Sequence, residues 1–331
     1  MYIHLTCLIF FCIIQPNQIL LGDRLKLKNL KDLKFNDKVQ LLNRLKAEKD
    51  AVVLAHYYVN EDIQAVADYI GDSFFLAQKA TELKEKTVVM AGVYFMGESV
   101  KILNPSKNVL MPDIDADCPM AHMVSVQKIK EVRERYDDLA VVTYINSTAA
   151  IKAYSDICVT SSNAAKIVNK LKEKNIFFIP DKNLGAYVKK SLPDKNIILN
   201  DGYCPVHDEI DASDIKVYKG KVKIFAHPEC RKEVLDLADF IGSTKAIINE
   251  SGKYDDVLVV TEEGIFTELK KRFPNTNYRR LRKEPICNDM KKLTLDKVID
   301  VIENNKNQVN VSKDISSKAL IPLKRMLKLG A

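Results

Sequence analysis

The chain has 331 residues, of which 47% are hydrophobic and 29% charged, with a formal net charge of +7. This length exceeds what one small core requires and predicts two or three domains. Because glycine and proline number only 11 each and no segment is dominated by a few residue types, the composition excludes a disordered or low-complexity chain.

The first residues carry a short apolar segment, LTCLIFFCII at 5–14. No lysine or arginine precedes it, and it is too short to span a bilayer. We interpret residues 1–36 as an N-terminal apolar extension outside the main fold. It is either a wrongly assigned start or a disposable leader, with a true signal peptide as the less favoured alternative. Removal of residues 1–22 is expected to leave folding and activity unchanged.

The cysteines form a poor disulfide framework, because their number is odd and their spacing is wide. They are Cys7, Cys12, Cys118, Cys158, Cys204, Cys230 and Cys287. We therefore expect a reducing, cytoplasmic location, with some thiols used for metal binding or catalysis.

An internal threefold repeat organises the rest of the chain. Three apolar runs each end in a polar tripeptide: HYY at 56–58, YIN at 144–146 and HPE at 227–229. An aspartate follows the first residue of each tripeptide after 12 positions, and a hydroxyl residue follows each aspartate after five. The aspartates are Asp68, Asp156 and Asp239, and the hydroxyl residues are Ser73, Ser161 and Thr244. We expect these hydroxyl residues to be N-caps of helices.

The cysteines keep the same register. Cys118 lies 50 residues after the first aspartate, and Cys204 and Cys287 each lie 48 residues after theirs. A second apolar run stands between these markers in each unit, at 87–93, 176–180 and 257–261, and helical patterns separate the runs. Strands that alternate with helices predict parallel βαβ units.

The expected fold is α/β, with three repeated αβα domains in pseudo-threefold symmetry around a central site. The boundaries are 37–138, 139–221, and 222–331 with its C-terminal helices. Because the carboxyl ends of parallel strands face a common crevice, the tripeptides supply candidate acids, bases and hydrogen-bond donors there. These are His56, Tyr58, Tyr144, Asn146, His227 and Glu229.

Three cysteines from separate loops do not resemble a structural zinc site, which is usually built from paired ligands. They suit a 4Fe-4S cluster with one iron left open, which can act as a Lewis acid. Burial without function is the alternative for any one cysteine, and it remains the interpretation for Cys158 and Cys230. His207 has no counterpart in the repeat and is kept as a substrate-contacting or supporting group. The basic run at 278–284 is interpreted as a solvated face, not a nucleic-acid site.

At this point the motifs GVYFMGESVKILNP, DADCPM, YINSTAAIKAYSD, PDKNLG, GYCPVH, HPEC and PICNDMKK, with the repeat, resemble the quinolinate synthase family over residues 37–331. The resemblance implies condensation of iminosuccinate (iminoaspartate) with dihydroxyacetone phosphate to quinolinate, with release of phosphate and two waters, in NAD biosynthesis. It also implies one 4Fe-4S cluster per chain, held by Cys118, Cys204 and Cys287, and a transferase-class enzyme. Some members carry CxxCxxC at the third ligand, whereas this chain has only Cys287.

Matched motif by motif, the resemblance implies roles for further residues. Tyr58, His227 and Glu229 correspond to catalytic positions. The substrate-binding positions would be His56, Ser73, Tyr144, Ile145, Asn146, Ser161, His227, Pro228, Glu229 and Thr244. The division of acid and base roles among the catalytic residues is open, with Glu229 the preferred base.

The partners expected from this assignment are the two substrates and an aspartate oxidase or aspartate dehydrogenase that supplies the imine, without nucleic acid or membrane. Two other functions stay open. One is a 4Fe-4S-dependent hydro-lyase acting on another small acid. The other is a non-catalytic iron–sulfur or zinc module, for example one that binds RNA with a salt-dependent affinity.

Overall fold

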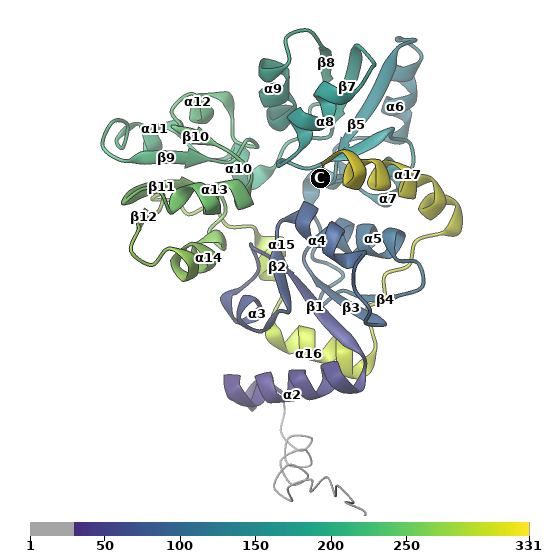
Figure 1. Cartoon of the computed structure of the whole chain (residues 1–331), viewed down its shortest axis with the longest axis vertical. Helices are drawn as coiled ribbons and strands as arrows, with labels where there is room; N and C mark the ends of the chain where they lie inside the picture. The colour runs from purple at the N-terminus through teal and green to yellow at the C-terminus, as the bar shows by residue number, and fades with distance from the viewer. Residues whose placement is uncertain (1–29, 331) are drawn as a thin grey trace, which may run out of the picture.

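The computed structural model describes residues 30–330, in which three parallel sheets lie around a common centre (Figure 1). Residues 1–29 lie outside the described part. They include the apolar segment at 5–14 with Cys7 and Cys12, so the predicted effect of removing residues 1–22 stays a prediction. The described part begins with η1 (Leu30–Asp32) and α2 (Phe35–Glu48).

Each of the three units contains a four-stranded parallel sheet, and the strand order is the same in all three: β2-β1-β3-β4, β6-β5-β7-β8 and β10-β9-β11-β12. The first unit consists of β1 (Ala51–His56), α3 (Glu61–Val66), β2 (Tyr69–Gly71), α4 (Ser73–Ala80), β3 (Thr87–Ala91), α5 (Tyr94–Leu103), β4 (Asn108–Leu110) and η2 (Pro119–His122). The second consists of α6 (Val126–Arg133), β5 (Leu139–Tyr144), α7 (Ala149–Lys152), β6 (Ile157–Val159), α8 (Ala164–Lys170), β7 (Asn175–Ile179), α9 (Lys182–Ser191), β8 (Asn196–Leu199) and α10 (Pro205–Asp208). The third consists of α11 (Ala212–Lys216), β9 (Lys223–Ala226), α12 (Lys232–Leu235), β10 (Phe240–Ile241), α13 (Thr244–Ser251), β11 (Asp256–Val260), α14 (Ile265–Arg272), β12 (Asn277–Arg279) and α15 (Asn288–Lys291).

The predicted α/β fold is therefore confirmed. The first and second apolar runs of each unit form its two central strands, β1 and β3 in the first unit, and helices flank each sheet (Figure 1). These strands are apolar along their length because a parallel sheet covered on both faces exposes neither set of side chains to water. The outer strands have only two to four residues.

The repeated aspartates form hydrogen bonds with the backbone of the first strand in each unit. Each carboxylate accepts a hydrogen bond from a backbone N–H of the unit's first strand, one residue before this strand begins to pair with the outer strand β2, β6 or β10. The contacts are Val53 N to Asp68 Oδ2 at 2.8 Å, Val141 N to Asp156 Oδ2 at 2.7 Å, and Ile224 N to Asp239 Oδ2 at 2.9 Å. The aspartates thus satisfy buried donors of the sheet, and the fixed spacing in the sequence follows from this shared geometry.

The chain after the third unit packs against the first two. Helix α16 (Leu295–Asn304) contacts α2 and β3, and α17 (Lys313–Gly330) contacts β6, α7 and α5 (Figure 1). The boundaries 37–138, 139–221 and 222–331 remain a prediction. Within residues 30–330, no helix combines the length and the apolar character that crossing a bilayer requires.

Candidate active site

A cavity of ≈ 470 Å³ lies where the three units meet. All three predicted cysteines and nine of the other predicted site residues line it, each unit contributing both kinds. These nine are His56, Tyr58, Ser73, Tyr144, Asn146, Ser161, His227, Glu229 and Thr244. Ile145 and Pro228, the middle residues of the second and third tripeptides, are buried and do not line the cavity.

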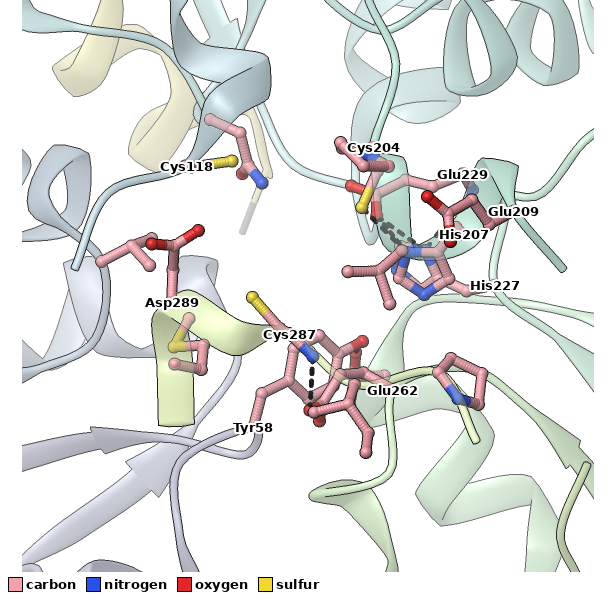
Figure 2. A pocket seen from close by; sticks show the side chains of 18 of the residues that line it. Tyr58, Cys118, Cys204, His207, Glu209, His227, Glu229, Glu262, Cys287 and Asp289 are labelled. Atoms are coloured by element: carbon pink, nitrogen blue, oxygen red, sulfur yellow. Dashed lines mark hydrogen bonds and ion pairs between the residues drawn. The ribbon is translucent and has the colours of Figure 1, made fainter. Parts of the chain in front are cut away.

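The cysteines Cys118, Cys204 and Cys287, hereafter the cap cysteines, occupy equivalent places in the three units. Each is the N-cap residue of a short helix, η2, α10 or α15. Their sulfur atoms point from three sides into one open space (Figure 2). Cys158 lies in β6, and Cys230 directly follows the third strand-end tripeptide in the sequence. Both are fully buried. The repeat register therefore separates the thiols that face the cavity from those that do not.

Two opposing effects act on the cap cysteines. Burial raises the pKa of each thiol, to about 11 for Cys287. Backbone N–H groups of the following helical turn donate toward each sulfur and lower the pKa, for example those of Met290 and Asp289 at Cys287. Such donors stabilise a thiolate, which is the form that binds metal. Three thiols share one open space, and no fourth thiol lines the cavity within residues 30–330. Once deprotonated, they would match the donor set of a cubane with one open iron.

Glu229 is the centre of a buried polar cluster beside Cys204 (Figure 2). Its Oε2 lies 2.8 Å from His207 Nδ1 and 3.5 Å from His227 Nδ1, and the two imidazole rings stack with centroids 4.7 Å apart. All three side chains are almost fully buried. Burial alone would raise the pKa of Glu229, but His227, His207 and a hydrogen bond from Tyr144 outweigh it, so the pKa lies below its usual range. Glu229 is therefore ionised at neutral pH.

The histidines of the first and third tripeptides make the same local contact. His56 Nδ1 accepts from the N–H of Tyr58 at 3.2 Å, and His227 Nδ1 accepts from the N–H of Glu229 at 3.4 Å. Burial lowers the pKa of His56 to about 4 and that of His227 to about 3. Both rings are thus neutral at neutral pH. Because Nδ1 is the acceptor, each ring carries its proton on Nε2, which can donate to a ligand.

Tyr58 connects the first unit to the third. Its Oη lies 2.7 Å from Thr244 Oγ1 and 3.0 Å from Thr261 Oγ1, and Thr261 Oγ1 lies 2.8 Å from His207 Nε2. Burial raises the pKa of Tyr58 well above its usual value, so the phenol keeps its proton at neutral pH. The hydroxyl is therefore an available proton donor.

The expectation that Ser73, Ser161 and Thr244 are N-caps is wrong. Ser73 and Thr244 are the first residues of α4 and α13, while the caps are Asp72 and Ser243, whose side chains accept from Phe75 N and Ala246 N. Ser161 lies before α8, whose N-cap position is Asn163. At α4 and α13 the residue before the helix satisfies a free N–H group, whereas Asn163 makes no such side-chain bond at α8. Ser73, Ser161 and Thr244 all line the cavity.

Sequence reasoning missed Glu262, which is fully buried and lines the cavity. Its Oε1 accepts from the N–H of Cys287 at 3.2 Å and lies 3.3 Å from Lys291 Nζ, which also donates to Tyr58 O at 2.9 Å. Burial raises the pKa of Glu262 to about 7. The available signal was its place directly after the second apolar run of the third unit. Asp181, also fully buried, follows the corresponding run of the second unit.

His207, expected to be a substrate-contacting or supporting group, lines the cavity. Its Nδ1 lies 3.2 Å from Cys204 Sγ as well as 2.8 Å from Glu229. The ligand atoms of Cys204, His207 and Glu229 all lie within 4.8 Å of one another, so these residues could hold a single metal ion. This group and the three cap cysteines share Cys204.

The chain is similar to known proteins over most of its length. A family model described as quinolinate synthetase A protein matches residues 40–328. The chain is 54% identical over 293 residues to a quinolinate synthase of Fusobacterium nucleatum, covering 87% of this chain and 98% of that protein. It is 46% identical over 294 residues to one of Clostridioides difficile, covering 87% and 97%. A quinolinate synthase 2 of Methanosarcina acetivorans is 42% identical over 294 residues, covering 87% and 94%.

Proposed function

Since this chain belongs to the quinolinate synthetase A protein family, and is thus an enzyme of NAD biosynthesis, we propose that it condenses iminosuccinate with dihydroxyacetone phosphate. The products are quinolinate, inorganic phosphate and two waters, which makes the enzyme a transferase. An aspartate oxidase or an aspartate dehydrogenase would supply the imine. The observation that carries the proposal is the meeting of three equivalent cap cysteines with a buried carboxylate and two neutral histidines in one cavity.

Cys118, Cys204 and Cys287 would hold one 4Fe-4S cluster. When bound, this group supplies an iron without a protein ligand, which acts as a Lewis acid toward a substrate oxygen. The equivalent cap positions support the assignment, because each sulfur receives backbone N–H donors that favour the thiolate. The Glu262 contact to the Cys287 N–H and to Lys291 would fix the third ligand.

Both substrates are anions, yet Lys283 is the one lysine or arginine among the described residues that line the cavity, and it pairs with Glu209 at 3.2 Å. Recognition therefore depends on neutral donors. His56 and His227 present Nε2–H groups, and Ser73, Ser161 and Thr244 present hydroxyls. The Oδ1 of Asn146 has no hydrogen-bond partner among residues 30–330 although it is buried, so it would accept from a substrate N–H or O–H.

The proton transfers would be divided between two residues. The Glu229 carboxylate is ionised and accepts a proton from the triose or from the substrate nitrogen during condensation. The Tyr58 hydroxyl keeps its proton and donates it to a leaving hydroxyl. His227 would position Glu229 by accepting its backbone N–H at Nδ1 and would donate to the substrate from Nε2.

Product analysis tests this proposal. Protein kept free of oxygen is supplied with dihydroxyacetone phosphate and iminosuccinate generated from aspartate in the same vessel, and quinolinate and phosphate are measured by chromatography. We expect one phosphate per quinolinate. Cys204→Ser should abolish both products, whereas Cys158→Ala, which alters a buried thiol outside the cavity, should keep them.

Other results would favour the rival functions. A full cluster without quinolinate would contradict the proposal and favour a hydro-lyase acting on another small acid. Bound metal without any turnover, together with RNA binding that weakens as salt is added, would favour a binding module.

A further inference from the structure

A second group of possible metal ligands shares one residue with the cap cysteines. It consists of Cys204, His207 and Glu229, hereafter the mixed-ligand triad. Cys204 is one of the three cap cysteines, whereas His207 and Glu229 lie away from the other two (Figure 2). Thiolate, imidazole and one carboxylate are the donors that zinc takes in proteins, while magnesium and calcium take oxygen atoms almost alone.

The geometry of the triad is close to that of a mononuclear site. His207 Nδ1 lies 2.8 Å from Glu229 Oε2 and 3.2 Å from Cys204 Sγ, and the three ligand atoms lie within 4.8 Å of one another. Around a tetrahedral zinc ion, neighbouring N, O and S ligand atoms are about 3.3–3.6 Å apart. The two His207 distances therefore each need to lengthen by roughly half an ångström or less, and Cys204 Sγ and the Glu229 carboxylate, which lie within 4.8 Å, need to approach by at most about 1.3 Å to form a zinc site.

A second observation supports metal binding at His207. The other ring nitrogen, Nε2, lies 2.8 Å from the hydroxyl of Thr261, which is fully buried. A metal-binding histidine usually donates its second N–H to such a partner, which fixes the orientation of the ring. Thr261 can accept this proton because its own hydroxyl can donate to Tyr58 Oη at 3.0 Å.

We propose that the cluster-free protein binds one zinc ion through Cys204, His207 and Glu229, with water in the fourth position facing the cavity. On binding, the Cys204 thiol loses its proton to solvent, and His207 binds the ion through Nδ1 while an N–H at Nε2 donates to Thr261. The charge of the site rises by one, because the divalent ion replaces one proton. The cavity lining gives the water a place to reside.

The consequence is competition between the two metal groups. Cys204 cannot bind zinc and an iron of the cluster in the same way at once, so zinc in the triad would block cluster assembly. This competition rests on the proposed function, because it takes Cys204 to be a cluster ligand. The binding of the ion does not, since Cys118 and Cys287 have no part in it.

Cobalt(II) provides a coloured probe for the site, and zinc should displace it because zinc binds such ligands more tightly. The full-length chain, stripped of iron and reduced without oxygen, is titrated with Co²⁺. We expect one equivalent per chain, with the near-ultraviolet absorption of a thiolate–cobalt bond and the visible bands of four-coordinate cobalt. Glu229→Gln and Cys204→Ser should each weaken binding at least tenfold.

The matched control is the double variant Cys118→Ser, Cys287→Ser, which removes the other two thiols and should bind cobalt as wild type does. Equal loss in the double variant and in Cys204→Ser would overturn the proposal, because the ion would then lie among the three cap cysteines. Absence of cobalt absorption in the wild type would also overturn it.

The competition has its own readout. Zinc-loaded protein given ferrous iron, sulfide and reductant should not develop the brown absorption of a cluster until a chelator removes the zinc. Rapid cluster formation in the presence of bound zinc would overturn the competition. Failure to form a cluster even without zinc would instead overturn the cluster assignment and leave the zinc site standing.

Discussion

At the scale of single residues, the surroundings of Glu229 determine what this carboxylate can do. Burial without partners would keep it protonated, and a protonated carboxyl cannot act as a base. His207 at 2.8 Å, His227 at 3.5 Å and the hydrogen bond from Tyr144 reverse that effect and lower its pKa. The carboxylate is thus ionised inside a cavity where it can accept a proton from a bound substrate.

Replacing Glu229 with glutamine tests this role. Glutamine keeps the shape and most hydrogen bonds but cannot take up a proton, so turnover should fall by about a hundredfold or more. Iron content should stay unchanged, because the cap cysteines are untouched. The measurement is steady-state quinolinate formation beside iron content, with Glu233→Gln on the exposed first turn of α12 as the matched control. Near-normal turnover with full iron content would remove Glu229 as the base and leave Tyr58 or His227.

The sequence predicted the residues of the site better than their partners. Its three-part register selected twelve side chains that line the cavity, because residues at equivalent strand ends and caps occupy equivalent places. The pairing of His207 with Glu229 could not be predicted from the repeat, because it joins α10 of one unit to a loop of another and has no counterpart in the other units. The N-cap assignment was wrong by one residue at Ser73 and Thr244 because Asp72 and Ser243, which also suit a cap, directly precede them.

At the scale of secondary-structure elements, the repeated aspartates explain how each sheet begins in the same way three times. The carboxylate of Asp239 accepts from the buried N–H of Ile224, and the backbone N–H of Asp239 returns a bond to Ile224 O at 2.8 Å. Asp68 and Asp156 make the same pair of contacts with Val53 and Val141. The sequence showed the spacing of these aspartates but not their function, because a fixed interval does not say which backbone group a side chain meets.

Substituting Asp239 with alanine should destabilise the protein. It leaves the N–H of Ile224 without its acceptor, at a cost of about 1–3 kcal/mol. An asparagine side chain retains an acceptor oxygen, so Asp239→Asn should recover most of the loss. The free energy of unfolding is measured in urea, with Asp236→Ala as the control. Asp236 contacts only surface lysines, and its replacement should change stability by about 0.5 kcal/mol or less. Equal effects at both positions would contradict the proposed role of the repeated aspartates.

At the scale of the whole molecule, the site belongs to no single unit, so the three units must stay in register for the cavity to exist. The C-terminal helix α17 helps to hold them, because it contacts α5 of the first unit and β6, α7 and α8 of the second. Its apolar face buries Ala319, Leu323 and Met326 fully. The repeat pattern could not predict this long-range packing, because the helix follows the last repeated motif and has no equivalent in the other units.

Leu323→Ala should therefore weaken the assembly of the first two units. Leu323 is fully buried, and removing most of such a side chain from a core costs about 2–5 kcal/mol. Ile321, on the same helix and 62% exposed, is the matched control, since Ile321→Ala should change stability by about 0.5 kcal/mol or less. Thermal unfolding of the two variants measures the difference. Equal unfolding temperatures would show that the packing of α17 does not stabilise the first two units.

The central claim is that Cys118, Cys204 and Cys287, each from a different unit, hold one 4Fe-4S cluster. The most direct test is iron and acid-labile sulfide analysis with an absorption spectrum. The protein is purified without oxygen and supplied with iron and sulfide that are free of zinc. The account predicts brown protein with about four irons and four sulfides per chain, and loss of both in the Cys204→Ser variant. One zinc ion per chain with no visible absorption under these conditions would contradict it.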